Sequence, residues 1–316
     1  MQICWILILL SLSAAQAHVG TRVYPVYELP TVDLPDIHDG SLEDWEDALG
    51  VPTLTNADFT GHPLIGGDPT ATDDLAWQVF LAWHHATGRI YVGMVRVDDV
   101  YLNAYDGSDV WSMWQYDATE FLVDGDHSGG MYQGPTVGRG DLLSQAQQYM
   151  MLPTSAAGRS MSLWEADSRP FPPSQTAWLT QPPFGDAGGR DFVGLPTESV
   201  LEFYITPFDE LVPDVPDQSR PSRLASGNII GLQLNVADFD VPGEPHSGFF
   251  ALGGASDAWR DASQFVDAEL VGCHVLDCSG ARPSAVAADS WGRIKAGLQV
   301  ASGENKLATR RQGDLR

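Results

Sequence analysis

Short runs in which apolar and polar residues alternate recur along the chain and predict β-strands. The clearest run covers residues 228–236, where one face carries Ile230, Leu232, Leu234 and Val236. Residues 77–83 alternate in the same way, with a tryptophan at each end. Residues 89–97 are apolar on both faces, so we expect this strand in the centre of a sheet.

Further strands are expected at residues 200–205, 248–252 and 265–271, and turns rich in glycine, proline and aspartate separate them. Helical periodicity is almost absent from the chain. Many short strands joined by such turns are typical of an antiparallel β-sandwich. We therefore predict an all-β fold, with one sandwich domain over residues 18–284.

Residues 131–198 depart from this pattern because they are rich in glycine, proline, serine and glutamine. Residues 145–151 have the composition of a short helix, which Pro153 would end. The segment has no periodic core of its own, so we expect a long insertion on the sandwich rather than a second domain.

The two ends of the chain are expected to lie outside the fold. Residues 1–17 resemble a secretory signal peptide, with a short apolar run followed by the small-x-small site Ala15-Gln16-Ala17. We expect the protein to be secreted, extracellular or periplasmic, with no membrane span. Residues 285–316 form a polar C-terminal tail with a short helical turn near Trp291.

The net charge of the chain limits the kinds of molecule that it can bind. The chain has 42 acidic and 17 basic residues, and its formal net charge is −25. Such a field repels nucleic acid and anionic membrane surfaces and attracts divalent cations. Most of these carboxylates are expected to form a solvated surface.

Tryptophans in two kinds of sequence context suggest two roles. Trp45, Trp77 and Trp83 lie among apolar residues and are expected in the core. Trp111, Trp114 and Trp259 lie among Ser, Asp, Gln and Arg, which favours exposure. Exposed rings stack on the C–H faces of sugars while neighbouring polar groups bind hydroxyls. Core packing is the competing interpretation for each of these three.

Several motifs occur in an order that resembles a known family. They are Asp39-Gly-Ser-Leu-Glu-Asp-Trp45, Arg89-Ile-Tyr-Val-Gly-Met-Val95, Asp117-Ala-Thr-Glu-Phe-Leu-Val-Asp124 with its glycine turn, Glu202-Phe-Tyr-Ile-Thr-Pro207, and Trp259 before the last strand. Together they resemble the family 9 carbohydrate-binding modules, sugar-binding relatives of the DOMON β-sandwich. The resemblance covers residues 36–272 apart from the insertion.

The resemblance implies a sugar held between two tryptophans and calcium ions that stiffen loops. Matched by position, the first ring is Trp111 or Trp114 and the second is Trp259. Polar partners for the hydroxyls are then Asn103, Asp109 and Glu120. We expect a non-catalytic module that binds mono- or oligosaccharides or polysaccharide ends and serves polysaccharide recognition or degradation.

The turn after residue 123 has half of a calcium motif. Asp124, Asp126 and Ser128, followed by Gly129, match the first positions of an EF-hand loop. The motif then fails, because Pro135 occupies the position of the bidentate glutamate. A structural calcium site completed by a distant carboxylate and a plain polar turn both remain open.

Cys273 and Cys278 are expected to form a local disulfide, because an exported protein matures in an oxidising compartment. A metal site with His274 and Asp277 is the weaker alternative, since no second cysteine pair follows.

Other functions remain open at the level of sequence. Glu120 and Glu202 on separate strands have the residue types of a glycosidase pair. His18, if it became the amino terminus, would bind copper given a second histidine such as His62, His84 or His246. A haem-binding DOMON module would use Met113 or His127, and a structural surface domain would bind no ligand.

Overall fold

The computed structural model describes residues 18–30, 34–134, 145–158, 160–163 and 173–273. The expected signal peptide, the expected C-terminal tail and Cys278 lie outside these residues. Cys273 is disulfide-bonded. Within the described residues, no helix has the length and apolar character needed to cross a membrane.

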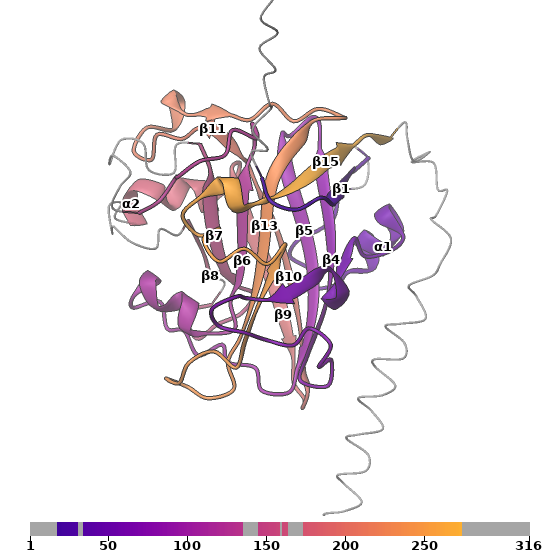
Figure 1. Ribbon diagram of the computed structural model, residues 1–316, viewed down its shortest axis with the longest axis vertical. Coiled ribbons are helices and arrows are strands. Elements are labelled where there is room, and N and C mark those ends of the chain that lie inside the picture. Colours follow the sequence, from indigo (N-terminus) through magenta and orange to yellow (C-terminus); the bar gives the residue numbers. More distant parts are fainter. Residues whose placement is uncertain (1–17, 31–33, 135–144, 159, 164–172, 274–316) are drawn as a thin grey trace, which may run out of the picture.

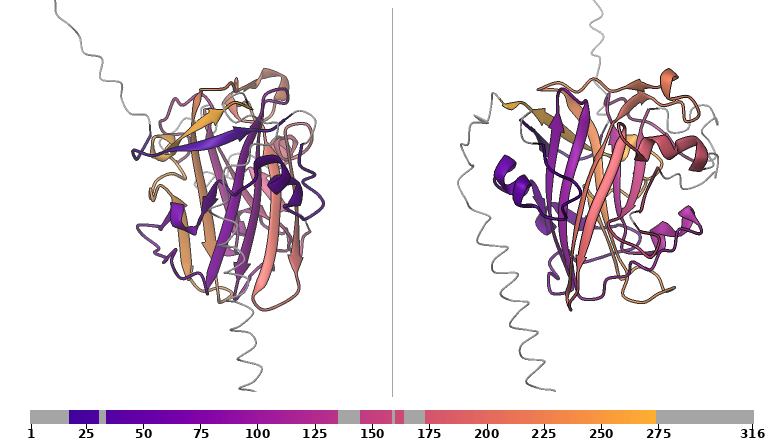
Figure 2. Two further views of the ribbon diagram at one scale, coloured as in Figure 1. Left: turned by 90° about the vertical axis from the view of Figure 1, so that its right-hand side faces the viewer. Right: turned by 180° about the vertical axis from the view of Figure 1, so that it is seen from behind.

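The strands form two packed layers (Figures 1 and 2). One layer contains β8 (Ser160–Leu163), β7 (Gln147–Leu152), β6 (Thr119–Asp124), β13 (Ile229–Asp238), β14 (Gly248–Leu252) and β3 (Phe59–Gly61). The other contains β2 (Leu54–Thr55), β4 (Leu75–His84), β5 (Arg89–Asp98), β10 (Thr197–Ile205) and β9 (Gly185–Phe192). Neighbouring strands within each layer are antiparallel, which confirms the predicted β-sandwich.

Two further strands connect the layers. β15 (Val266–Val271) pairs with the first half of β13, and β1 (Val23–Glu28) pairs in parallel with both β15 and β4. β14 pairs with the second half of β13, so β13 has different neighbours along its two halves. A separate pair, β11 (Phe208–Glu210) and β12 (Arg220–Pro221), lies outside the sandwich.

The helices are short and lie on the outside of the strands. They are α1 (Glu43–Leu49), α2 (Pro173–Thr176), η1 (Asn56–Asp58), η2 (Val110–Gln115), η3 (Ala177–Thr180), η4 (Pro216–Gln218) and η5 (Ala262–Gln264).

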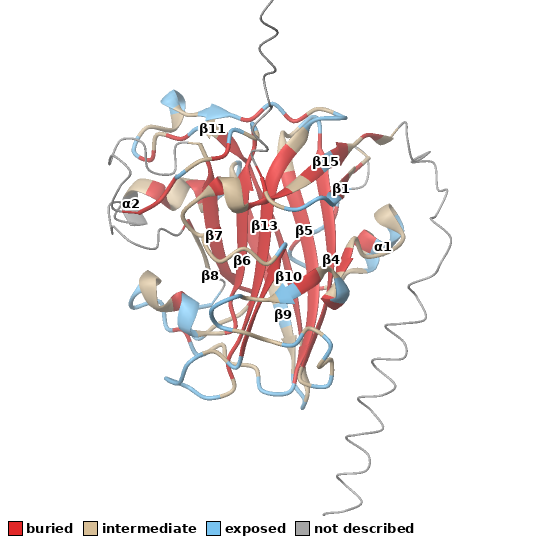
Figure 3. Cartoon of the chain, viewed as in Figure 1, coloured by how far each residue is buried: buried red, intermediate tan, exposed pale blue. Residues whose placement is uncertain are grey.

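The core lies between the layers, where Figure 3 shows the strands buried along most of their length. The inward face of β13 is the one predicted from its alternation, and Trp77 and Trp83 of β4 are fully buried in the same cluster. Phe121 of β6 meets Phe203 of β10 edge to face, with ring centroids 5.5 Å apart. The strand expected to be central is β5, which pairs on both sides.

Residues 131–198 contribute strands β7, β8 and β9 to the two layers, and the helix expected at residues 145–151 is wrong. Strand β7 was not predicted because it contains buried glutamines, which are usually surface residues. Gln147 is fully buried, and its side-chain amide bonds to the backbone of Phe208 as a neighbouring strand would. The amide nitrogen donates to the Phe208 carbonyl and the amide oxygen accepts from the Phe208 N–H, both at 3.0 Å. A buried polar side chain satisfied in this way cannot be distinguished from a surface residue by its type alone.

Arg96 of β5 is a buried cation that joins the two layers. Its guanidinium donates to the carbonyl of Asp117, two residues before β6, at 2.9 Å and to that of Ala237 in β13 at 3.3 Å, and it pairs with the Asp98 carboxylate. Asp117 in turn accepts a hydrogen bond from the backbone of Phe239 at 2.7 Å. A buried charge is stable only with such partners, so this network fixes how the layers meet.

Helix α1 covers the outer face of β4, β5 and β10 through Trp45, which is fully buried. The indole Nε1 of Trp45 donates to Glu202 Oε1 at 2.9 Å, and the Gly40 N–H donates to Glu202 Oε2 at 3.1 Å. Burial, together with the nearby Asp39 and Asp44 charges, raises the pKa of Glu202 to about 8. The carboxyl is therefore held mainly protonated at neutral pH.

This raised pKa predicts that the protein is more stable in mild acid. The folded state keeps the Glu202 proton up to about pH 8, whereas the unfolded chain releases it near pH 4.3. The group's contribution to the free energy of unfolding should thus be lost as pH rises from about 5 to about 8, by on the order of 1 kcal/mol per pH unit. Urea denaturation at several pH values measures this slope.

Glu202→Gln removes the titrating group and should make the slope less steep. Glu244 is exposed, so Glu244→Gln is the matched control and should leave the slope unchanged. Equal slopes in the wild type and Glu202→Gln would contradict the assignment.

Candidate functional site

A row of buried polar side chains lies on the outer face of the β7–β6–β13 sheet. Glu120 of β6 is directly opposite Asn235 of β13, and Gln148 of β7 lies diagonally across from Glu120. Neighbouring residues along each strand point the other way, into the core, as Phe121 and Leu234 do. The same three strands therefore build the core and a polar surface.

Hydrogen bonds link this row into a ladder. Asn235 Nδ2 donates to Glu120 Oε2 at 2.8 Å, and Gln148 Nε2 donates to the same oxygen at 3.3 Å. Gln133 donates to Gln148 at 3.2 Å and Gln233 donates to Asn235 at 2.8 Å, which fixes both amides. The ladder orients Glu120 before any ligand arrives.

Burial raises the pKa of Glu120 to about 7, even though the hydrogen bonds from Asn235 and Gln148 oppose the shift. The carboxyl thus changes charge near neutral pH. As a carboxylate it only accepts hydrogen bonds, and as an acid it also donates one.

Aromatic and apolar side chains wall a cavity of about 390 Å³ above this ladder. Its lining consists of His62, Leu64, Ile65, Trp114, Glu120, Gln148, Asn235, His246, Phe249, Ala255, Ser256, Ala258 and Trp259. Apolar walls with a few converging polar groups are the usual design of a small-molecule site.

Trp114 reaches this cavity because η2 is anchored at both its start and its centre. The Asp109 carboxylate accepts a hydrogen bond from the Trp111 N–H at 3.1 Å and caps the helix. Met113 is buried against Met150 and Leu152 of β7. Trp114 follows Met113 and remains 41% exposed, which is high for so large an apolar ring.

The two tryptophans have different surroundings. The Arg260 guanidinium lies 5.2 Å from the ring centroid of Trp259, so a ligand must stack on the opposite face of that ring. Trp114 lies nearly parallel to His246, with ring centroids 5.9 Å apart. Burial lowers the pKa of His246 to about 4, which keeps this imidazole uncharged near pH 7.

The structure brings together three of the six residues that the sequence suggested for sugar binding. Trp114, Glu120 and Trp259 line one cavity, whereas Trp111, Asn103 and Asp109 do not. Asn103 donates to Asp191 at 2.6 Å instead, and Asp109 caps η2.

Several lining residues escaped the sequence analysis. Asn235 had a signal, since it stands at a polar position of a strictly alternating strand. Gln148 was hidden in the expected helix. His62, Leu64 and Ile65 come from a loop closed by a bridge between His62 and Gly66, and nothing local in the sequence places this loop beside β6.

Of the residues of the alternative functions, Glu120, His62 and His246 line the cavity, whereas His18, Glu202, Met113 and His127 do not. Glu202 lies beneath α1 and does not line the cavity with Glu120. Met113 is fully buried in an apolar cluster. His127 pairs with Asp267 at 2.8 Å.

The Asp124–Gly129 turn is held by its own backbone. Asp124 accepts hydrogen bonds from the N–H groups of Ser128 at 3.3 Å and Gly129 at 2.6 Å, and Asp126 accepts from Ser128 at 3.1 Å. Burial alone would raise the pKa of Asp124, but contacts with His18 and Gly129 outweigh it and lower the pKa.

Three carboxylates converge at another place. Asp74, Asp99 and Asp240 bring one oxygen each within 4.8 Å of one another. Burial, reinforced by the neighbouring carboxylates, raises the pKa of both Asp74 and Asp99. The Asp240 Oδ1 atom is buried without a hydrogen bond. A similar group, Asp98, Asp117 and Asp238, is already neutralised in part by Arg96.

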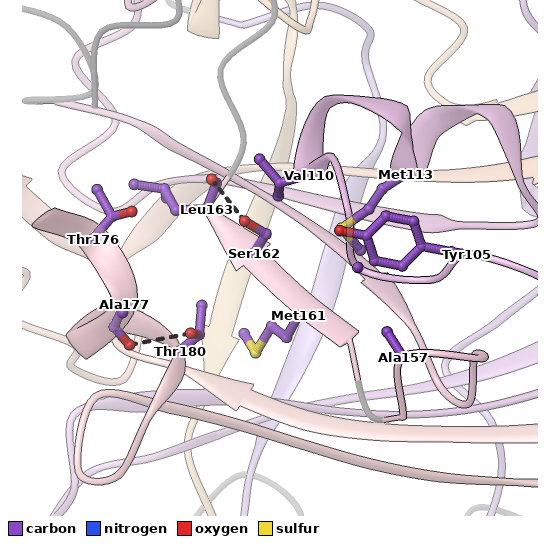
Figure 4. A pocket seen from close by; sticks show the side chains of 11 residues that line it. Tyr105, Val110, Met113, Ala157, Met161, Ser162, Leu163, Thr176, Ala177 and Thr180 are labelled. Atoms are coloured by element: carbon purple, nitrogen blue, oxygen red, sulfur yellow. Dashed lines mark hydrogen bonds between the residues drawn. The ribbon is translucent and has the colours of Figure 1, made fainter. Parts of the chain in front are cut away.

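A second cavity of about 310 Å³ is also lined by residues of η2 (Figure 4). Val110 and Met113 line it together with residues of β8 and η3. Its hydroxyl groups bond locally, since Ser162 donates to Leu163 and Thr180 donates to Ala177, both at 3.2 Å.

Comparison with known proteins finds similarity at the level of structure. No family model and no curated protein matches the sequence. A family 9 carbohydrate-binding module from Caldicellulosiruptor kristjanssonii in complex with cellotriose is 13% identical with a TM-score of 0.47, and the match covers 78% of this chain and 94% of that one. A structure of a family 9 module from the same organism in complex with glucose is also 13% identical, with a TM-score of 0.48, and the match covers 78% of this chain and 96% of that one.

Proposed function

We propose that the protein binds a neutral sugar in the cavity between Trp114 and Trp259, with Glu120, Gln148 and Asn235 holding its hydroxyls. The observation that carries the proposal is the ordered ladder of polar side chains beneath aromatic walls. The ligands would be mono- or oligosaccharides or the ends of polysaccharides. Binding them would serve the recognition or degradation of polysaccharides.

The chemistry of the lining favours a sugar over other ligands. Sugar rings have apolar C–H faces and a polar edge, which match aromatic walls and a floor of amide and carboxyl groups. His62 and His246 both have pKa values lowered by burial, so Glu120 is the lining residue that carries charge near neutral pH. A strongly anionic ligand would therefore meet no countercharge in the cavity.

Calorimetric titration tests the proposal directly. The wild type should bind at least one of glucose, cellotriose, xylobiose and laminaribiose. Trp114→Ala and Trp259→Ala should each weaken binding about 10- to 100-fold, because each removes apolar area worth about 1–3 kcal/mol.

Trp111→Ala is the matched control, since Trp111 lies on the same short helix but does not line the cavity. Its affinity should equal that of the wild type. Failure of the wild type to bind any sugar in a wide glycan panel refutes the function. Equal weakening by Trp111→Ala and Trp114→Ala would refute the site.

Binding should depend on pH through Glu120. Its pKa is about 7, and hydroxyl donors bind more strongly to the ionised carboxylate. We expect affinity to rise severalfold between about pH 6 and about pH 8. Glu120→Gln should bind more weakly and lose this pH dependence. Affinity that falls over the same range would mean that Glu120 donates rather than accepts.

We also propose that calcium stabilises the fold, and that Asp74, Asp99 and Asp240 hold the ion. Calcium prefers clustered oxygen ligands, and the unbonded Asp240 oxygen suits this role. The Asp124 oxygens already accept backbone hydrogen bonds, which makes that turn the less suitable of the two.

A chelator should lower the melting temperature at low ionic strength, because an ion bound only by the folded state stabilises it by mass action. Asp240→Asn should remove this response, whereas Asp214→Asn, at an exposed position, should keep it. Loss of the response in Asp126→Asn but not in Asp240→Asn would place the ion in the glycine turn instead. No response in the wild type refutes the proposal.

An oxidising, extracytoplasmic location is the remaining part of the proposed function. It is supported by the signal-like residues 1–17 and by the disulfide-bonded state of Cys273.

A further inference from the structure

The imidazole of His18 is buried without a hydrogen bond. Its side chain is 0% exposed, and neither ring nitrogen makes a hydrogen bond. The nearest acceptors are carboxylates, Asp267 Oδ1 at 3.3 Å from Nδ1 and Asp124 Oδ2 at 3.4 Å from Nε2. Buried polar nitrogens are almost always hydrogen-bonded, so this ring requires an explanation.

The register of three strands creates the place for this ring. Gly231 of β13 pairs with Asp124 of β6 on one side and with Asp267 of β15 on the other (Figure 1). A Cβ atom at Gly231 would lie 2.5 Å from His18 Nε2. The absent side chain thus makes room for the imidazole between the two carboxylates.

A second imidazole meets the first at Asp267. His127 Nε2 lies 2.8 Å from Asp267 Oδ1, the same oxygen that His18 approaches, and the two rings are edge to face with centroids 4.0 Å apart. His18, His127 and Asp267 can each direct one ligand atom to a common point, since these atoms all lie within 4.8 Å of one another.

These distances match those between the ligands of a small divalent ion. Zinc binds imidazole nitrogen and carboxylate oxygen at about 2.0–2.2 Å in a tetrahedron, which places neighbouring ligand atoms about 3.3 Å apart. The Nδ1–Oδ1 distance of 3.3 Å agrees with this value, and the Nε2–Oδ1 distance of 2.8 Å needs only a small expansion.

Asp124 has the position of an outer partner. A metal-bound imidazole usually directs its second ring nitrogen to a carboxylate, which fixes the tautomer. If His18 Nδ1 faces the ion, Nε2 faces Asp124, whose oxygens are held by the N–H groups of Ser128 and Gly129.

We propose that His18, His127 and Asp267 bind a first-row divalent transition-metal ion of the zinc class, and that Asp124 positions His18. Two nitrogens and one oxygen suit such an ion better than calcium, which prefers oxygen alone. Both His127 and Asp267 remain about one-third exposed, so water completes the coordination and the ion can enter from this side. The site is separate from the sugar cavity, whose lining includes none of these residues.

Zinc titration of the full chain, purified without a histidine tag, tests the site in competition with a chromophoric chelator. The wild type should bind one equivalent, and Co²⁺ in its place should give the intense visible absorption of a tetrahedral centre. His127→Asn should weaken zinc binding at least 100-fold. His127 has a φ of 60°, and asparagine adopts this left-handed conformation readily, so the turn should be preserved.

Three controls make the result specific. Asp124→Asn should weaken binding about 10- to 100-fold, as loss of an outer partner does. His38→Ala should have no effect, because His38 and Asp186 form a comparable pair at 3.0 Å without a second imidazole. Circular dichroism should show each variant folded, and Asp267→Asn offers a second ligand variant if His127→Asn is not.

If the wild type does not bind one equivalent of zinc tightly, the proposal is overturned. Wild-type affinity in a folded ligand variant, or equal loss in His38→Ala, would overturn it as well. Sugar binding is measured separately, so either result leaves the proposed function to its own test.

Discussion

The pleat of the β7–β6–β13 sheet is the constraint on which both core and site depend. Successive residues of a strand face opposite sides, so Phe121 enters the core while Glu120 faces outward. A shift of one residue in the register of β6 would exchange these roles. The packing of the sandwich therefore fixes the position of the candidate binding groups, and Arg96 fixes how the two layers meet.

Buried polar side chains hold several parts of this protein in place. Glu120, Glu202 and the glutamines of β7 are all removed from water, and each is held by specific hydrogen bonds. At Glu202 this arrangement anchors α1, and at Glu120 it orders the polar floor of the cavity. Hydrogen-bonded burial of polar groups thus holds a helix on one layer and the floor of the candidate cavity on the other.

The sequence was informative where the physics is local. Alternation predicted β4 and β13, and a run apolar on both faces predicted β5. Polar neighbours singled out Trp111, Trp114 and Trp259, of which the last two line the cavity. Local patterns failed for β7, because buried glutamines resemble surface residues in type. They also failed for His18, since its position depends on how β6, β13 and β15 align around Gly231.

The cavity above Glu120 is built from two kinds of structure, strands and loops. Its floor belongs to central strands, whose replacement would damage the core, whereas its walls come from η2, the 62–66 loop and the segment before Trp259. Loops tolerate insertion and substitution far better than strands do. Changes in these loops can therefore alter the shape and size of the candidate cavity while the strands keep its polar floor in place, so the dimensions of the cavity and the stability of the scaffold can change independently.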